Sequence, residues 1–179
     1  MRYFCLALLF WFLPQYSALS QPHLDTAKSY IGVKELTGKN DGQAVEKFLK
    51  SVGRKKGDHW CAAYVSYCLI VNKVKYPVKM SGLARAFKTK SSINAIDVLT
   101  GRYSIPAGTI IVWERGNTIT GHTGFVIKQT GKNKFVTVEG NTSSGVKGSQ
   151  NNGDGVYKRT RSIEPANYFR ITAFTLVKY

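Results

Sequence analysis

Cys61 stands where a polar run ends and a long apolar stretch begins, a position that suits a reactive thiol. Residues 55–58 read Lys-Lys-Gly-Asp, whereas residues 60–71 are almost wholly apolar and predict a buried helix. A thiol in the first turn of a helix lies among backbone N–H groups that lack partners, at the positive end of the helix dipole. Such surroundings favour the thiolate, which is the nucleophilic form of cysteine. We therefore expect Cys61 to attack a carbonyl carbon.

His122 and Glu139 could complete this covalent chemistry. His122, in the run Gly-His-Thr-Gly, could take the thiol proton and return it to a leaving amine, because imidazole titrates near neutral pH. Glu139 could hold the other ring nitrogen and favour the imidazolium. Asn141 follows two residues later, so in an extended strand its side chain would share one face with that of Glu139. A cysteine, a histidine and a polar residue that orients the imidazole are the minimum parts of a cysteine hydrolase.

Three further residues are candidates for contacts with substrate. A tetrahedral oxyanion needs hydrogen-bond donors, and the backbone N–H of Cys61 is one candidate. Asn40, in an upstream turn, could supply a second donor. His59 should lie exposed on the rim of the cleft, where it could contact substrate. Trp60 could line a substrate groove or pack into the core.

The elements that must position these residues come in two groups. Helices are expected over residues 23–31, 41–53, 60–71 and 81–87, with Asp41 and Ser81 as caps of the second and fourth. Strands are expected over residues 109–113, 122–129, 134–139, 156–161 and 169–177. A hairpin turn over residues 130–133 would bring His122 beside residues 138–141. The class is therefore α+β, with N-terminal helices packed on an antiparallel sheet of about five strands.

Three segments resemble CHAP domains (cysteine, histidine-dependent amidohydrolases/peptidases). These segments are residues 57–66, 121–124 and 138–142. CHAP domains are peptidoglycan hydrolases of bacteria and phages, related to the NlpC-type papain-like enzymes. The resemblance implies a papain-like fold, peptidoglycan amide bonds as substrates and Cys61 as nucleophile. It also implies His122 as base, with Glu139 and Asn141 as orienting residues.

The sequence departs from this family at the second oxyanion donor. Many relatives place a glutamine just before the cysteine or a few residues upstream. Here those positions hold Lys55, His59 and Trp60. The identity of that donor therefore stays open.

Residues 1–20 are expected to be a cleaved secretory signal peptide. Arg2 precedes an apolar run over residues 3–13, and small residues end the segment at Ala18 and Ser20. The run is shorter than the stretch of about 20 residues that a membrane span needs. Residues 21–179, which number 179 − 20 = 159, would form one catalytic domain. We expect a secreted or periplasmic protein without stable insertion in a membrane.

Cys61 and Cys68 are the two cysteines after residue 20. In one helix they would lie roughly 10 Å apart along the axis. A disulfide needs Cα atoms within about 7 Å. Both thiols should therefore be unpaired, with Cys68 as a small buried filler of the core.

The chain is strongly basic, with a formal net charge of +16, or 16 − 1 = +15 without Arg2. Its lysines and arginines are scattered, and no nucleic-acid-binding module is visible, so nucleic acid is not an expected partner. Such a charge suits anionic surfaces, or serves solubility alone. We expect a monomer that binds peptidoglycan or another anionic cell-wall polymer.

Two other functions stay open on the sequence. A zinc hydrolase could use His59, Cys61, His122 and Glu139, although no two of them have a recognisable metal-ligand spacing. A non-catalytic, basic wall-binding protein could use the same fold. The prediction is a peptidoglycan hydrolase that forms a covalent thioester and needs no metal or cofactor. The shape of the pocket would decide whether it cuts the sugar–peptide amide or a peptide bond.

Overall fold

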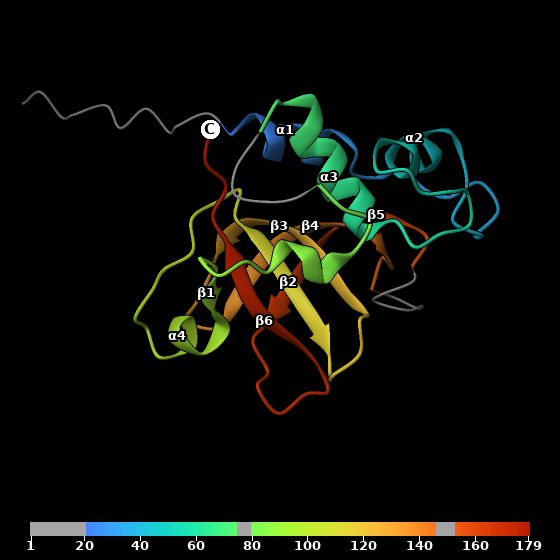
Figure 1. The fold of residues 1–179 in the computed structure, drawn as a ribbon. Coiled ribbons are helices and arrows are strands. Elements are labelled where there is room, and N and C mark those ends of the chain that lie inside the picture. Colours follow the sequence, from blue (N-terminus) through green and yellow to red (C-terminus); the bar gives the residue numbers. More distant parts are fainter. Residues whose placement is uncertain (1–20, 75–79, 146–152) are drawn as a thin grey trace, which may run out of the picture.

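The fold combines an antiparallel sheet with helices gathered mainly on one of its faces (Figure 1). The computed structural model describes residues 21–74, 80–145 and 153–179. The expected signal peptide, residues 1–20, lies outside the described residues. In the described part the helices are α1 (Pro22–Ser29), α2 (Gln43–Ser51), α3 (Cys61–Val71) and α4 (Ala95–Leu99), with a 3₁₀ turn η1 (Ala84–Phe87). The strands are β1 (Ile93–Asn94), β2 (Ile110–Arg115), β3 (Gly121–Gln129), β4 (Lys134–Thr142), β5 (Gly155–Ser162) and β6 (Phe169–Thr175).

The sheet has the order β1-β6-β2-β3-β4-β5, with each neighbouring pair antiparallel. β3 and β4 form the predicted hairpin, and the N–H of Thr130 donates to the carbonyl of Lys134 at 2.8 Å to close its turn. The sheet has one strand more than the expected five, because the short β1 pairs with β6. The α+β class is confirmed, and the arrangement is consistent with a papain-like fold.

α3 is the central helix of the core. It is apolar on all sides, and its residues 61–69 are all buried, as such a helix requires. It packs on β3 and β4, with α1 and α2 beside it (Figure 1). Strand residues alternate between two cores: Ile110 and Val112 join the α3 core, whereas Ile111 and Trp113 join a second core on the other face. The helix that begins with Cys61 is thus held rigidly against the hairpin that carries His122.

Two predicted helix caps are wrong. The cap position of α2 is Gly42, and Asp41 instead accepts hydrogen bonds from the N–H of Thr37 at 2.9 Å and its hydroxyl at 2.8 Å. The fourth helix is only η1, and Ser81 lies before it, accepting from the N–H of Leu83 at 3.0 Å. Short polar side chains of this kind bind nearby backbone in turns as readily as they cap helices.

Other element ends also differ from expectation. β1 and α4 lie between residues 88 and 104, a stretch for which the sequence predicts no element. β4 continues beyond its expected end at Glu139 to Thr142. Cys61 and Cys68 are both unpaired, as expected. None of the described helices is long and apolar enough to cross a membrane.

Candidate active site

Cys61 is the first residue of α3, and the helix begins there without a capping side chain. The first bond of the helix runs from the N–H of Tyr64 to the carbonyl of Trp60, at 2.8 Å. The N–H groups of residues 61–63 therefore have no acceptor within the helix. No acidic residue lies in the first turn, and Cys61 is only 6% exposed. The thiol thus lies at a positive helix end that no carboxylate of that turn compensates.

His122 is the second residue of β3, and its side chain is almost fully buried. Its Nε2 lies 2.9 Å from Oε2 of Glu139. Its ring packs at 5.2 Å, centroid to centroid, against Trp113. Nδ1 is buried and has no close hydrogen-bond partner among the described residues, while the Cys61 side chain is near enough to interact with the ring. Since Glu139 holds Nε2, Nδ1 is the nitrogen left for the thiol.

The electrostatics of this trio favour the charged forms of both His122 and Glu139. Burial lowers the pKa of His122, but interactions with Cys61 and Glu139 outweigh it and raise that pKa to about 9. Burial likewise raises the pKa of Glu139, but hydrogen bonds and charges from Arg161 and His122 prevail and lower it to about 2. At neutral pH the site therefore holds an imidazolium beside a carboxylate.

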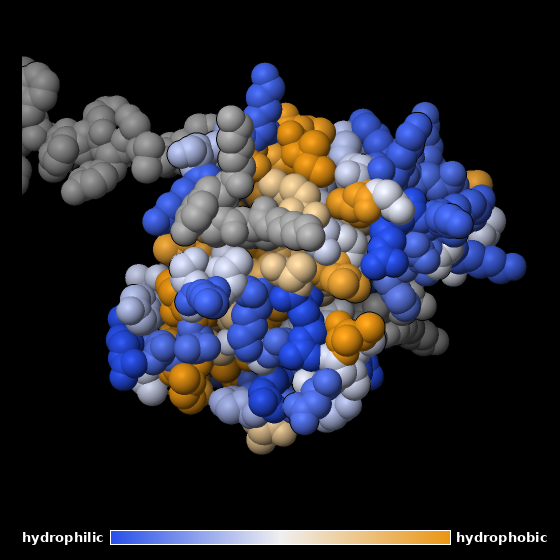
Figure 2. Space-filling view, in the orientation of Figure 1, coloured by the Kyte–Doolittle hydropathy of each residue, from blue (hydrophilic) through white to orange (hydrophobic). Residues whose placement is uncertain are grey.

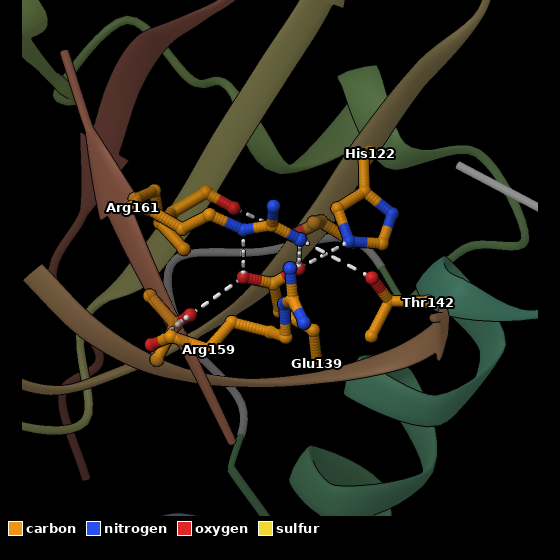
Figure 3. A network of polar contacts seen from close by, with 8 residues as sticks. His122, Glu139, Thr142, Arg159 and Arg161 are labelled. Carbon is orange, nitrogen blue, oxygen red and sulfur yellow. Dashed lines mark hydrogen bonds and ion pairs between the residues drawn. The ribbon is translucent and has the colours of Figure 1, made fainter. Parts of the chain in front are cut away.

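Glu139 is fully buried, and besides His122 on β3 it is held by donors from β4 and β5 (Figure 3). Arg161 on β5 donates from Nε to Oε1 at 2.7 Å and from Nη2 to Oε2. The hydroxyl of Thr137 donates to Oε1 at 2.5 Å. Nη2 of Arg161 also reaches the hydroxyl of Thr142 at 3.2 Å. The carboxylate that binds His122 is therefore fixed in place by its neighbours rather than by the histidine alone.

Two glycines make room for the site. A Cβ on Gly124 would lie 2.7 Å from Cγ of Glu139, so the bare backbone lets that side chain reach His122. A Cβ on Gly140 would lie 2.7 Å from the Trp60 ring and 2.9 Å from Tyr64. The end of β4 can approach the first turn of α3 only because this position lacks a side chain.

Asn141 lies at the site, where its side chain contacts the backbone just before Cys61. In the amide orientation that satisfies both of its neighbours, its oxygen accepts from the N–H of Trp60 at 3.0 Å and its nitrogen donates to the carbonyl of Gly153 at 2.9 Å. The expectation that Glu139 and Asn141 share one face is wrong. Asn141 has a left-handed backbone (φ 54°) where the β4–β5 register shifts, which breaks the alternation of an extended strand. Its contact fixes the residue just before Cys61.

Trp60 packs in the core. Its side chain is fully buried against Phe48 and Tyr64, and its indole N–H donates to Glu35 at 2.8 Å. This burial corrects its assignment as a substrate-binding residue.

His59 and Asn40 occupy different places. His59 is exposed and lines a pocket together with Cys61, where substrate could reach it. The side-chain N–H of Asn40 donates to the carbonyl of Gly57 at 3.1 Å, and its backbone N–H donates to Glu35 at 2.9 Å. The amide proposed as an oxyanion donor is thus already engaged with the loop that leads to α3.

Arg161 and Thr137 are the site residues that sequence reasoning missed. Thr137 could have been found, since it lies two residues before Glu139 and so shares its face. The contact of Arg161 with Glu139 could not have been found in this way, because it depends on the register between β5 and β4, which a long connection joins.

The described residues offer no evident metal site. Within residues 21–74, 80–145 and 153–179, no three His, Cys, Asp or Glu side chains are grouped so that they could hold an ion. Glu139 is already bound by Arg161 and His122. In this part of the chain the zinc alternative therefore has no ligand set.

Comparison with protein families bears on the same residues. The family model of the CHAP domain matches residues 53–141, a range that contains Cys61, His122, Glu139 and Asn141. Searches among curated proteins and among solved structures found no match. The resemblance visible in the sequence is thereby confirmed. The chain carries a CHAP domain, the domain of a family of peptidoglycan-related amidases and peptidases.

Proposed function

We propose that this protein is an exported cysteine amidohydrolase or endopeptidase that cleaves an amide bond of peptidoglycan through a thioester. The proposal is carried by the 2.9 Å hydrogen bond between His122 and Glu139, together with the interaction of the Cys61 side chain with the same ring, inside the matched CHAP range. A nucleophile, a base and a group that orients the base are what this chemistry needs.

The first step forms the thioester. The Cys61 thiolate attacks the amide carbonyl carbon, and the carbonyl π electrons move to oxygen. The N–H groups at the uncapped start of α3 support this oxyanion. When the tetrahedral species collapses, the C–N bond breaks and the leaving amine takes the proton from Nδ1 of His122.

The second step releases the acid. Neutral His122 takes a proton from water, and the resulting hydroxide attacks the thioester carbonyl. The C–S bond then breaks, which restores the thiolate and the imidazolium. Glu139 stays ionised throughout, since it is held by Arg161 as well as by His122.

The decisive experiment measures release of soluble fragments from purified peptidoglycan by the wild type and three variants. Cys61→Ala and His122→Ala should each lower kcat by roughly 10⁴-fold or more, because the parts of such a unit act together. Cys68→Ala is the matched control, since Cys68 is a buried thiol of the same helix, one whose pKa burial raises. Wild-type activity in Cys61→Ala, at equal folding, would refute the proposal.

The same assay separates the two other functions. A wall-binding protein without activity would bind walls equally well as the wild type and as Cys61→Ser, with no bond cleaved by either. A zinc hydrolase would lose activity with a chelator and regain it with zinc. Activity that resists the chelator but is abolished by alkylation supports the thioester route.

The basic surface supports attraction to the wall. In Figure 2, strongly hydrophilic residues gather at the end of the molecule formed by α2. With +15 formal charges after residue 20 (16 − 1), the chain would concentrate at anionic wall polymers without a separate binding module.

A further inference from the structure

A groove of about 780 Å³ lies at the end of β3 that is distant from the candidate active site. The loop of residues 101–107 forms one wall, and the end of β3 with the hairpin turn, residues 127–132, forms the other. His122 precedes Lys128 on β3 by six residues, which in an extended strand is roughly 20 Å. In Figure 1 the loop of residues 101–107 lies on the left, whereas α3 begins on the right. The groove is therefore separate from Cys61 and His122.

The side chain of Gln129 joins the two walls of the groove. Its Oε1 accepts a hydrogen bond from the N–H of Ile105, in the loop, at 2.7 Å. Its Nε2 donates to the carbonyl of Gly131, in the turn, at 3.0 Å. Where the loop ends, the N–H of Gly108 donates to the carbonyl of Val126 on β3 at 2.8 Å. The shape of the groove is thus set before any ligand arrives, which lowers the cost of binding.

The groove is positively charged. Its lining includes Arg102, Lys128 and Lys132, which are all exposed, and none of the described residues that line it is Asp or Glu. Arg102 is partly neutralised by its ion pair with Asp97, at 2.5 Å. The two lysines lie on the hairpin side, so the groove presents a positive charge to whatever enters it.

Tyr103 supplies an aromatic surface in the same groove. Its side chain is 48% exposed, and the neighbouring Ser104 is exposed as well. A single exposed aromatic residue needs no explanation on its own. Beside positive charges, however, a tyrosine ring can pack against the apolar face of a sugar while its hydroxyl forms hydrogen bonds. The groove therefore offers both kinds of contact that a charged sugar needs.

The density of charge in the groove suits an anionic polysaccharide better than a nucleic acid. A nucleic-acid strand carries one phosphate about every 3.4 Å, and its binding depends on neutralising several of them. Here two lysines and a partly neutralised arginine share about 780 Å³, a volume that accommodates a ligand of several rings. A polysaccharide with charges on only some of its sugars matches this arrangement.

We propose that this groove is a second binding site, which holds an anionic polysaccharide through Lys128, Lys132 and Tyr103. Its use on cell walls rests on the proposed function, whereas the binding itself does not depend on cleavage. A polymer held here would keep the protein at the wall and leave the Cys61 end free to reach the bond to be cut. Attraction to the wall would then come from one surface rather than from net charge alone.

Binding of hyaluronate, a polysaccharide with a carboxylate on every second sugar, tests the charged contacts. Lys128→Gln/Lys132→Gln should weaken this binding by about tenfold or more. Lys39→Gln/Lys50→Gln is the matched control, because it removes two exposed lysines near α2 and so changes the net charge equally. Equal weakening in the two double variants would show that net charge alone attracts the polymer, and would overturn the proposal.

Tyr103→Ala tests the contact with the sugar. It should weaken binding of hyaluronate by about threefold or more and leave unchanged the binding of polyphosphate, a polyanion without sugars. Tyr103→Phe, which keeps the ring, should bind hyaluronate like the wild type. At equal folding, loss of affinity for both probes or for neither would overturn the polysaccharide assignment. A larger loss for a single-stranded oligonucleotide than for hyaluronate would assign the groove to nucleic acid instead.

Hydrolysis of a soluble muropeptide separates this inference from the proposed function. The Lys128→Gln/Lys132→Gln and Tyr103→Ala variants should keep the wild-type kcat/KM, because the groove lies roughly 20 Å from His122. Normal hydrolysis with equal hyaluronate binding in all variants would reject the groove and leave the proposed function standing. Absence of hydrolysis by the wild type, with binding lost in the groove variants alone, would reject the proposed function and leave the groove as a polysaccharide site.

Discussion

Arg161 donates hydrogen bonds to both carboxylate oxygens of Glu139, the residue that binds the ring of His122. The arginine side chain is 14% exposed and the glutamate is not exposed at all, so the pair is buried. The guanidinium carbon of Arg161 also lies over the ring of Trp113, 5.6 Å from its centroid, and the same ring packs against His122. The guanidinium therefore supports the imidazole indirectly, through Glu139 and through Trp113.

Replacing Arg161 by methionine should destabilise the protein and impair catalysis together. Removing one partner of a buried ion pair costs about 3–5 kcal/mol in free energy of unfolding. The loss should shrink as the pH falls from about 4.5 through about 2, the lowered pKa of Glu139 in the folded protein, because the ion pair is lost once this carboxylate is protonated. Urea unfolding at pH 7 and at about pH 2 to 3 measures this difference. Arg161→Lys, which keeps the charge without the planar fork, should lie in between; equal stability of all three proteins would contradict the role.

The contact between His122 and Glu139 could be predicted from the sequence, because a turn at residues 130–133 fixes which ends of the hairpin meet. Arg161 could not, since the register of β5 against β4 depends on a long connection rather than on a short turn. The direction of Asn141 was predicted wrongly for a related reason. A single left-handed residue at a bulge interrupts the alternation of side chains between the two faces of the sheet. The pattern of apolar and polar residues along a strand does not predict such a bulge.

The two cysteines should differ sharply in reactivity. Burial raises the pKa of the Cys68 thiol, so little of it is thiolate at pH 8. Cys61 lies at the uncapped N-terminus of the same helix, beside the imidazolium of His122. Brief treatment with iodoacetamide followed by peptide mapping should find the label on Cys61, and His122→Ala should slow that labelling by about tenfold or more. Faster labelling of Cys68 than of Cys61 in the native protein would contradict the assignment of Cys61 as the reactive thiol.

Activity should fall at alkaline pH. The leaving amine takes its proton from His122, whose pKa is raised from 6.5 to about 9, so kcat/KM on soluble fragments should decline as the pH rises through about 9.

The raised pKa of His122 should also make the stability of the protein depend on pH. A group whose pKa is higher in the folded state stabilises fully below its unfolded value, and this contribution is lost as the pH rises through about 9. In His122→Gln, the free energy of unfolding measured by urea titration should fall less between neutral pH and pH 9 than it does in the wild type. An unchanged pH dependence in this variant would contradict the role assigned to His122.

Gly124 should tolerate no side chain. In Gly124→Ala the new methyl would lie 2.7 Å from both Cγ of Glu139 and the carbonyl oxygen of Val138. Such overpacking costs about 1–3 kcal/mol. Since small displacements of catalytic groups can cost roughly 10²-fold, kcat should fall at least about tenfold. Gly131→Ala, in the hairpin turn with its nearest neighbour at 3.9 Å, is the control and should keep full activity.

Salt should weaken the enzyme on intact walls much more than on short soluble fragments. The formal charge of +15 after residue 20 (16 − 1) comes from lysines and arginines scattered along the sequence. Attraction to a polyanion is then the sum of many weak charge–charge interactions, each of which dissolved ions screen. The screening length falls from about 10 Å at 0.1 M to about 3 Å at 1 M ionic strength. Chemistry inside the buried Cys61–His122–Glu139 site should respond far less. Turbidity loss of whole walls and cleavage of a soluble muropeptide, measured across this range, give the dependence of activity on salt for each substrate.

The double variant Lys128→Gln/Lys132→Gln removes two exposed charges of the β3–β4 hairpin. It should weaken the salt dependence on whole walls and leave that on the soluble muropeptide unchanged. Equal slopes for both substrates would mean that the charge serves solubility alone.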